Sequence, residues 1–151
     1  MNRIFLCLSL FAVAGLSPAF GQTVVPVDYA QAALDAITAS NIPAAEQHFS
    51  AIRDPAAKLY VLARIARANG EPEDAIRMLA RLIVRYPNDE KWTAISELQS
   101  AELYLELGML DAANVTARQI QQLHTGTDVA EKATALRERI KQDMEQAAEA
   151  K

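Results

Sequence analysis

Hydrophobic residues recur at intervals of three and four along most of the chain, and polar residues fill the positions between them. Two segments show the spacing most clearly: Leu59, Leu62, Ala63 and Ala66 near the middle, and Val129, Ala133, Leu136 and Ile140 near the C-terminus. This spacing places side chains on one face of an α-helix. No segment of useful length alternates between hydrophobic and polar residues, so the sequence predicts helices and no strand.

Start and stop signals divide the chain into seven predicted helices. Asp54 is an N-cap residue followed by a first-turn proline, Pro55. Gly70 suits the left-handed position that follows a helix, and Pro87 disfavours helix at Tyr86. Signals of these kinds give the following predicted helices: 28–40, 43–53, 55–69, 72–86, 90–107, 110–123 and 128–148.

Pairs of alanines twelve residues apart give the predicted helices a period. The pairs are Ala33 with Ala45, Ala63 with Ala75, and Ala101 with Ala113. A helix break precedes the second member of each pair by five residues, at Ser40, Gly70 and Gly108. Small residues in step with the breaks let two helices approach closely, and neither helix of such a pair can bury its apolar stripe alone. The sequence therefore predicts helix pairs that stack on one another.

The segment from Ala56 to Asp89 resembles a tetratricopeptide repeat, a helix-turn-helix unit of 34 residues. Its matching large, small, turn and stop positions are Leu59, Leu62, Ala63, Gly70, Ala75, Leu79, Leu82 and Pro87. The segment after it is similar at Ala101, Tyr104, Gly108, Ala113, Ala117 and Ile120, although Glu97 and Ser100 replace residues that are usually apolar. The segment before it matches at Tyr29, Ala33, Ala45, Phe49 and Ile52, without a turn glycine.

This resemblance spans roughly Pro26 to Gly126. It implies an all-α fold, a short α-solenoid of about three helix pairs that resemble tetratricopeptide repeats. The last predicted helix has one apolar face and many charges elsewhere, which is typical of a C-terminal helix that caps the end of an array.

The N-terminus has the features of a secretory signal. Met1–Arg3 supplies a positive start, and Ile4–Leu16 is an uncharged apolar run that is short for a membrane span. Small residues at Ala19 and Gly21 suit cleavage before Gln22. An uncleaved N-terminal anchor is the alternative interpretation, and it would be the chain's contact with a membrane. The predicted domains are a signal peptide over 1–21, a repeat domain over 22–126 and a capping helix over 127–151.

Composition and charge narrow the range of functions that the protein can have. Cys7, the one cysteine, lies in the signal, so we expect an exported protein without thiols or disulfides. A chain that is 51% hydrophobic and 23% charged suits a folded protein. The net charge is -4 and becomes -5 if Arg3 leaves with the signal, whereas a general nucleic-acid binder carries a basic excess. Nucleic acid is therefore not an expected partner.

Residues suited to catalysis are few. His48 and His124 are the two histidines and lie far apart in sequence, so they do not suggest a metal site and are expected at the surface or at helix ends. We find no glycine-rich phosphate loop, nucleophile elbow or zinc-protease motif. Glu102 and Glu106 share one helix face, and we interpret them as solvated surface carboxylates. The prediction is a protein that is not an enzyme and needs no cofactor or metal.

Arginines occur on both helices of the middle unit. In tetratricopeptide arrays the first helix of each unit lines a concave groove, so the resemblance implies that a partner contacts these residues: Tyr60, Arg64, Arg67, Leu98, Glu102 and Leu105. Arginine holds carboxylates bidentately, which makes Arg64 and Arg67 the predicted recognition residues. The lysine and asparagine set with which some family members clamp a C-terminal carboxylate is not present. The second helix carries a four-residue ladder that we interpret as a solvated outer stripe: Arg77, Arg81 and Arg85.

These observations predict an interaction or scaffold protein of a bacterial cell envelope, exported to the periplasm, that holds a peptide or partner protein of unknown identity in its groove. The leader and a likeness to small exported repeat proteins suggest the bacterial source. One alternative is a small all-α ligand-binding or enzymatic bundle. Another is a structural subunit of an envelope oligomer, in which this chain associates with copies of itself.

Overall fold

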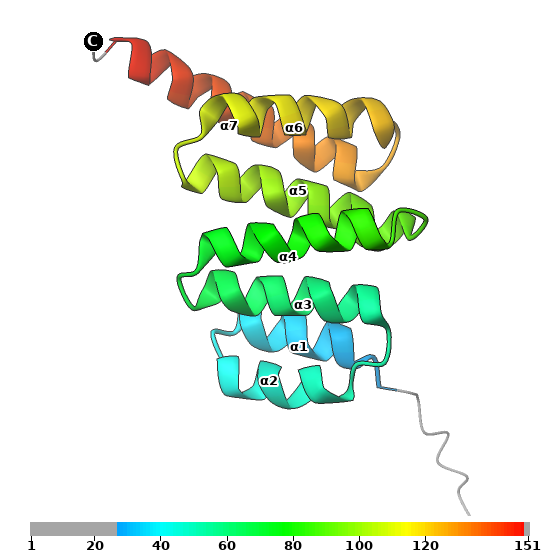
Figure 1. Cartoon of the computed structure of the whole chain (residues 1–151). Coiled ribbons are helices and arrows are strands. Elements are labelled where there is room, and N and C mark those ends of the chain that lie inside the picture. Colours follow the sequence, from blue (N-terminus) through cyan, green and yellow to red (C-terminus); the bar gives the residue numbers. More distant parts are fainter. Residues whose placement is uncertain (1–26, 150–151) are drawn as a thin grey trace, which may run out of the picture.

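The computed structural model describes residues 27–149, and this part of the chain forms seven α-helices and no strand (Figure 1). The helices are α1 (Tyr29–Thr38), α2 (Ile42–Ala51), α3 (Pro55–Ala68), α4 (Pro72–Arg85), α5 (Glu90–Glu106), α6 (Leu110–Leu123) and α7 (Asp128–Glu149). The all-α prediction is confirmed, and the predicted ends agree within two residues. The predicted signal peptide and Cys7 lie outside the described residues.

Side chains next to the helix starts explain several of these boundaries. The carboxylate of Asp54 accepts a hydrogen bond from the backbone N–H of Ala56 at 2.9 Å, as its N-cap position predicts. Asp28 caps α1 in the same way and accepts from two backbone N–H groups. Asn41 and Asp89 cap α2 and α5. These bonds satisfy N–H groups that have no partner inside the helix.

Each helix pair turns through the same three-residue connection. Ser40, Gly70 and Gly108 occupy equivalent left-handed positions, with φ values of 58°, 80° and 72°. In each turn the N–H of the next residue bonds back to a carbonyl five residues earlier, as Glu71 does to Ala66 at 3.0 Å. This is a Schellman motif, which favours glycine. The first pair thus has the same turn as the other two, with serine in place of glycine.

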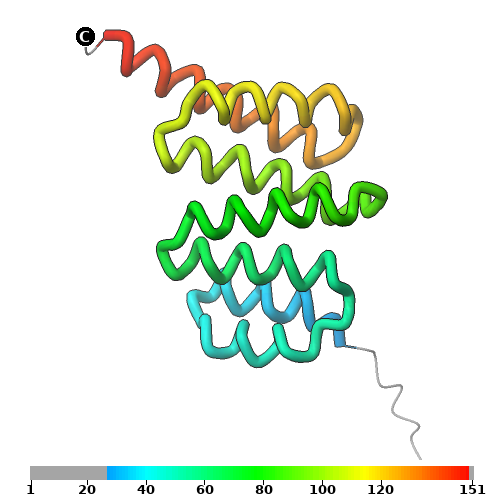
Figure 2. Tube along the Cα trace, in the orientation of Figure 1, coloured from blue at the N-terminus to red at the C-terminus, as the bar shows by residue number. Residues whose placement is uncertain are grey.

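The helices stack in two layers. The helices α1, α3, α5 and α7 contact one another in succession, whereas α2, α4 and α6 each contact only neighbours in sequence. In Figure 1, α1 and α7 lie behind α2 and α6, and the trace in Figure 2 runs back and forth from one end of the stack to the other. The closer spacing of the first layer makes it the inner, concave side.

Alanines sit where the paired helices meet. All six alanines of the twelve-residue pairs are buried, with at most 1% of their surface exposed. Leu79 and Leu82 from α4, Leu103 from α5 and Ile120 from α6 fill the space around them. Burying a side chain of this size contributes about 1.5–3 kcal/mol to folding. The sequence period therefore marks the positions of closest helix approach.

The last helix packs on the end of the stack. α7 buries Ala130, Ala133, Leu136 and Ile140, and it contacts α5 and α6. Beyond Ile140 every described residue is exposed, and this end of α7 extends past α6 in Figure 1. Within residues 27–149, no helix combines the length and apolarity needed to cross a bilayer.

Candidate partner-binding groove

The inner layer brings the six predicted groove residues together. Five of them line a surface cavity of about 360 Å³ with walls from α3, α5 and α7: Tyr60, Arg64, Arg67, Leu98 and Glu102. The sixth, Leu105, lines an adjoining cavity of about 340 Å³ that shares Arg67 and Glu102 with the first. We call these two cavities the concave groove.

Tyr60 and Leu98 form the floor of the concave groove. They are 6% and 8% exposed, so most of each side chain belongs to the core. The ring of Tyr60 packs against Trp92 with 5.4 Å between centroids, which fixes its orientation. A partner would therefore meet the Tyr60 hydroxyl rather than a free aromatic ring.

Arg67 joins two helices across the concave groove. Its Nη1 lies 3.1 Å from Oε2 of Glu102, and its Nη2 pairs with Glu106. Burial lowers the pKa of Arg67, but hydrogen bonds and charge attraction from Glu106 and Glu102 outweigh burial and raise the pKa overall. The charge of Arg67 is thus already balanced inside the protein, and its role is to hold α3 against α5.

Arg64 is different, because no carboxylate among the described residues pairs with it. The side chain is half-buried, and its Nη1 donates a long bond of 3.4 Å to the Tyr60 hydroxyl. Its Nε is buried and has no hydrogen-bond partner within residues 27–149. A buried donor without a partner is costly, and a guanidinium presents several donors suited to a carboxylate. Unlike Arg67, Arg64 is therefore an arginine of the concave groove that can receive an anion.

The structure adds residues that the sequence interpretation of the groove omitted, among them Lys132, Gln99 and Glu106. Lys132 of α7 lines the groove beside Arg64 and makes no ion pair within the described part of the chain. The side-chain amide of Gln99 donates to Glu102 at 2.8 Å, and Glu106 completes the clamp on Arg67. Glu102 and Glu106 were interpreted as solvated surface carboxylates; their side chains are 40% and 48% exposed, and both also pair with Arg67. Lys132 could not be assigned because its helix was interpreted only as a cap.

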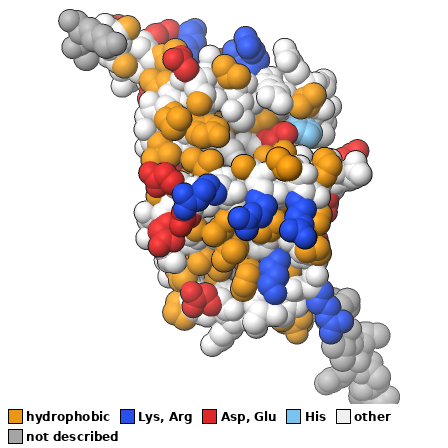
Figure 3. All heavy atoms as spheres, in the orientation of Figure 1, with side chains coloured by type: hydrophobic (Ala, Val, Ile, Leu, Met, Phe, Trp, Pro, Cys, Tyr) orange, Lys and Arg blue, Asp and Glu red, His pale blue; other side chains and the backbone are white. Residues whose placement is uncertain are grey.

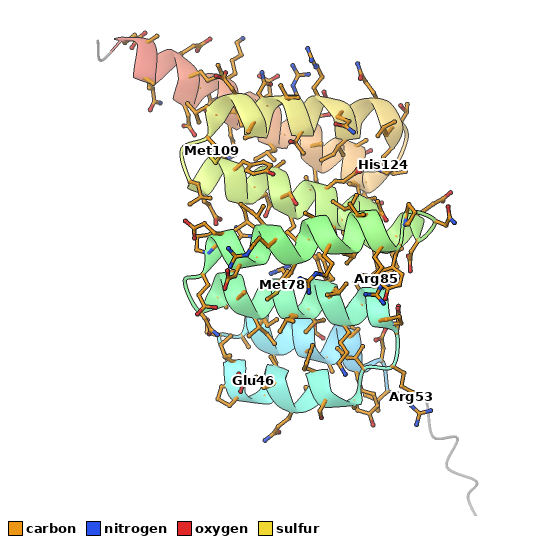
Figure 4. The ribbon with its side chains drawn as sticks, viewed as in Figure 1. Glu46, Arg53, Met78, Arg85, Met109 and His124 are labelled. Atoms are coloured by element: carbon orange, nitrogen blue, oxygen red, sulfur yellow. The ribbon has the colours of Figure 1, made fainter. Side chains whose placement is uncertain are left out.

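The arginine ladder of α4 lies on the opposite layer. Arg77, Arg81 and Arg85 are all exposed, as their position on a second helix implies. Figure 3 shows a row of basic side chains along α4, and Figure 4 places Arg85 at the end of that helix. Arg77 pairs with Asp74 of its own helix, and Arg85 lies 6.0 Å from the Tyr86 ring centroid.

The two histidines lie in different parts of the structure. His124 ends α6, as expected, but it is half-buried, and its Nε2 lies 2.8 Å from a carboxylate oxygen of Glu97. This contact explains the polar residue at a repeat position that is usually apolar. His48 lies on α2 near the ring of Tyr29. The described residues contain no cluster of three or more potential metal ligands.

Comparison with protein families identifies one repeat within the chain. Residues 59–89, which cover α3, α4 and the turn between them, match the model described as tetratricopeptide repeat. No curated protein and no solved structure matches the chain significantly. The matched segment is a tetratricopeptide repeat, and the helix pairs on both sides of it stack against it as the units of a repeat array do. That repeat points to a role in protein–protein interaction or scaffolding, and the family is generally not enzymatic.

Proposed function

We propose that this chain is a non-enzymatic scaffold of a bacterial cell envelope that holds a peptide or partner protein in its concave groove. The supporting observation is Arg64, a half-buried arginine with a buried Nε that has no partner in residues 27–149. With the Tyr60 hydroxyl and Lys132 beside it, this arginine suits an acidic side chain of the bound segment. Leu98 and Leu105 supply apolar contact to that segment.

The proposed location is the periplasm. It rests on the sequence of the N-terminus, where the positive start, the apolar run Ile4–Leu16 and the small residues at Ala19 and Gly21 have the order of a secretory signal. Cell fractionation of a bacterium that expresses the full chain, with mass spectrometry of its N-terminus, tests both export and cleavage before Gln22. Retention of Met1 in a cytoplasmic fraction contradicts this part of the proposal.

Site-specific crosslinking tests the function of the concave groove. A photoreactive residue is placed at Lys132, which is exposed and lines the groove. The matched control carries the same photoreactive residue at Arg118, which is exposed on α6 of the outer layer. Irradiation of intact cells should give an adduct at position 132 and not at 118, and mass spectrometry then identifies the partner.

A substitution at Arg64 tests whether the adduct at position 132 depends on this arginine. Arg64→Glu should remove the adduct at position 132, because it replaces the receiving cation with an anion. Circular dichroism should remain that of the parent, since Arg64 makes no ion pair within the described structure. Equal adducts at both positions, or an adduct that persists with Arg64→Glu, contradict the proposal. If light scattering finds a stable oligomer, and its subunits contact one another through this groove, the structural-subunit alternative is favoured.

A further inference from the structure

The concave groove has two parts that follow one another along the inner layer. α5 contacts both α3 and α7, and these two helices do not contact each other, so the groove runs along α5 between them. The cavity of about 360 Å³ follows α5 over residues 95–102, and the cavity of about 340 Å³ follows it over residues 102–106. On α7, Lys132 lines the first cavity, and later residues up to Asp143 line the second. We call the first the Arg64 cavity and the second the Glu106 cavity.

The Arg64 cavity carries a surplus of positive charge. Its lining includes three cations and one carboxylate: Arg64, Arg67, Lys132 and Glu102. Arg67 pairs with Glu102 at 3.1 Å, whereas Arg64 and Lys132 have no carboxylate partner within residues 27–149. Two cations therefore remain for a bound segment, and this cavity favours an acidic side chain.

The Glu106 cavity carries the opposite surplus. Its charged residues are Arg67, Glu102, Glu106, Arg139 and Asp143. Glu102 and Glu106 share the single charge of Arg67, so one carboxylate charge stays unbalanced. Arg139 and Asp143 are exposed, form no ion pair among the described residues and cancel each other in the count. Glu106 is also the last residue of α5, where the helix dipole is negative. This cavity therefore favours a basic side chain.

The two surpluses are far enough apart to act separately. Lys132 lines one cavity and Arg139 lines the other, and they are separated along α7 by a rise of about 10 Å. Exposed charges more than about 8 Å apart are largely screened from one another at physiological ionic strength. A bound segment thus meets a positive field in one part of the groove and a negative field in the other.

We propose that the concave groove selects a segment with an acidic and a basic residue about 10 Å apart and holds it in one direction. The acidic side chain meets Arg64 and Lys132, and the basic side chain meets Glu106 and Asp143. An extended segment spans this distance with about three residues, and a helical one with about seven. The opposite direction is disfavoured because it brings like charges together. This inference rests on the proposed function and adds to it the charge pattern of the bound segment.

A peptide from the partner tests the charge pattern. The probe is a fluorescently labelled synthetic peptide of the segment that the adduct at position 132 identifies. That segment should contain a basic residue within about seven positions of an acidic one. Replacing this basic residue by glutamate should raise the Kd for the full chain, measured by fluorescence anisotropy, roughly three- to tenfold. The difference between the two peptides should shrink in high salt.

Two lysine substitutions on α7 locate the contact. Asp143→Lys should raise the Kd of the unchanged peptide roughly three- to tenfold, because it places a cation beside the peptide's basic residue. Glu138→Lys makes the same charge change at an exposed position that lines neither cavity, and it should leave the Kd as it is. The Asp143→Lys chain should bind the glutamate-substituted peptide more tightly than the parent chain does, as a direct contact between the two charges requires. Both positions are exposed, so circular dichroism should be unchanged.

Three outcomes overturn the inference: equal binding of the two peptides, equal effects of Asp143→Lys and Glu138→Lys, or a segment without a basic residue near its acidic one. None of them affects the adduct at position 132 or its dependence on Arg64, so the proposed function would stand. Absence of that adduct would overturn the proposed function and this inference together.

Discussion

The indole Nε1 of Trp92 donates a hydrogen bond to Oδ2 of Asp54 at 2.8 Å, and this bond ties the start of α5 to the start of α3. The other oxygen of the same carboxylate accepts from the backbone N–H of Ala56 at 2.9 Å. One aspartate thus caps the first helix of the middle repeat and fixes the first helix of the next. Trp92 in turn packs against Tyr60 on the floor of the concave groove.

Asp54→Ala should lower the free energy of unfolding by about 2–4 kcal/mol. About 1 kcal/mol is the loss of a helix cap, and the remainder is the cost of leaving the buried Trp92 N–H without a partner. Urea denaturation measures the difference. The matched control is Asp28→Ala, which removes a cap of α1 that bonds only within its own first turn and should cost about 1 kcal/mol. Equal losses for the two variants would mean that the Trp92 bond contributes nothing.

The turn of the first repeat should be stabilised by glycine. Ser40 has φ 58°, which costs a side-chain-bearing residue roughly 1–2 kcal/mol. Ser40→Gly removes this strain and adds some unfolded-state entropy, so we expect a net gain of about 0.5–1 kcal/mol in thermal or urea denaturation.

The reverse substitution, glycine to alanine in an equivalent turn, is the control for Ser40→Gly. Gly70 has φ 80°, and a Cβ built there meets no atom within 4 Å, so Gly70→Ala should cost about 1 kcal/mol from backbone strain alone. Gly108→Ala should behave alike. A loss of stability with Ser40→Gly would show that the serine side chain contributes more than its backbone strain costs.

The ion pairs of Arg67 should contribute the same free energy of unfolding at neutral and at mildly alkaline pH. Because the pKa of Arg67 is raised in the folded state, its contribution is fully present below the unfolded pKa and is lost only as pH rises through the folded value. Arg67→Ala should therefore lower the free energy of unfolding by about 0.5–1 kcal/mol, since the paired carboxylates are partly exposed.

Urea denaturation at neutral and at mildly alkaline pH checks this prediction. The difference between the parent and Arg67→Ala should be the same at both and should shrink in high salt, because exposed charges are screened. A difference that disappears in mild alkali would be inconsistent with a raised pKa. The matched variant Lys141→Ala removes an exposed pair at 3.9 Å with Glu145 and should change stability by no more than a few tenths of a kcal/mol.

Substitutions of Arg64 and Arg67 should have different effects in a binding assay with the partner that the crosslinking experiment identifies. Arg64→Gln should weaken capture at least about tenfold without changing the free energy of unfolding, because its cation is available to the partner. Arg67→Gln should reduce stability and weaken capture less, since its charge already pairs with Glu102 and Glu106. Circular dichroism checks the fold of both variants. A larger effect of Arg67→Gln on capture would reverse the assignment.

Much of the fold could be predicted because its signals are local. Pro55, Gly70 and Gly108 set helix ends through backbone geometry that depends on neighbouring residues alone. The uneven spacing of the turns, 30 and then 38 residues, follows from a short α2 and a long α5. The buried alanines confirm the register that the twelve-residue spacing predicts.

The sequence by itself determined seven helices and their pairing, and its resemblance to a tetratricopeptide repeat implied the six residues that share the inner layer. It could not decide which groove arginine lacks a carboxylate partner. That depends on Glu102 and Glu106, which lie 35 and 39 residues after Arg67 in the sequence and pair with it in the fold. Nor could it show that the two cavities of the concave groove differ in charge. Helix ends and pairing follow from local geometry and period, whereas charge balance and grooves arise only when distant side chains meet in the stacked array.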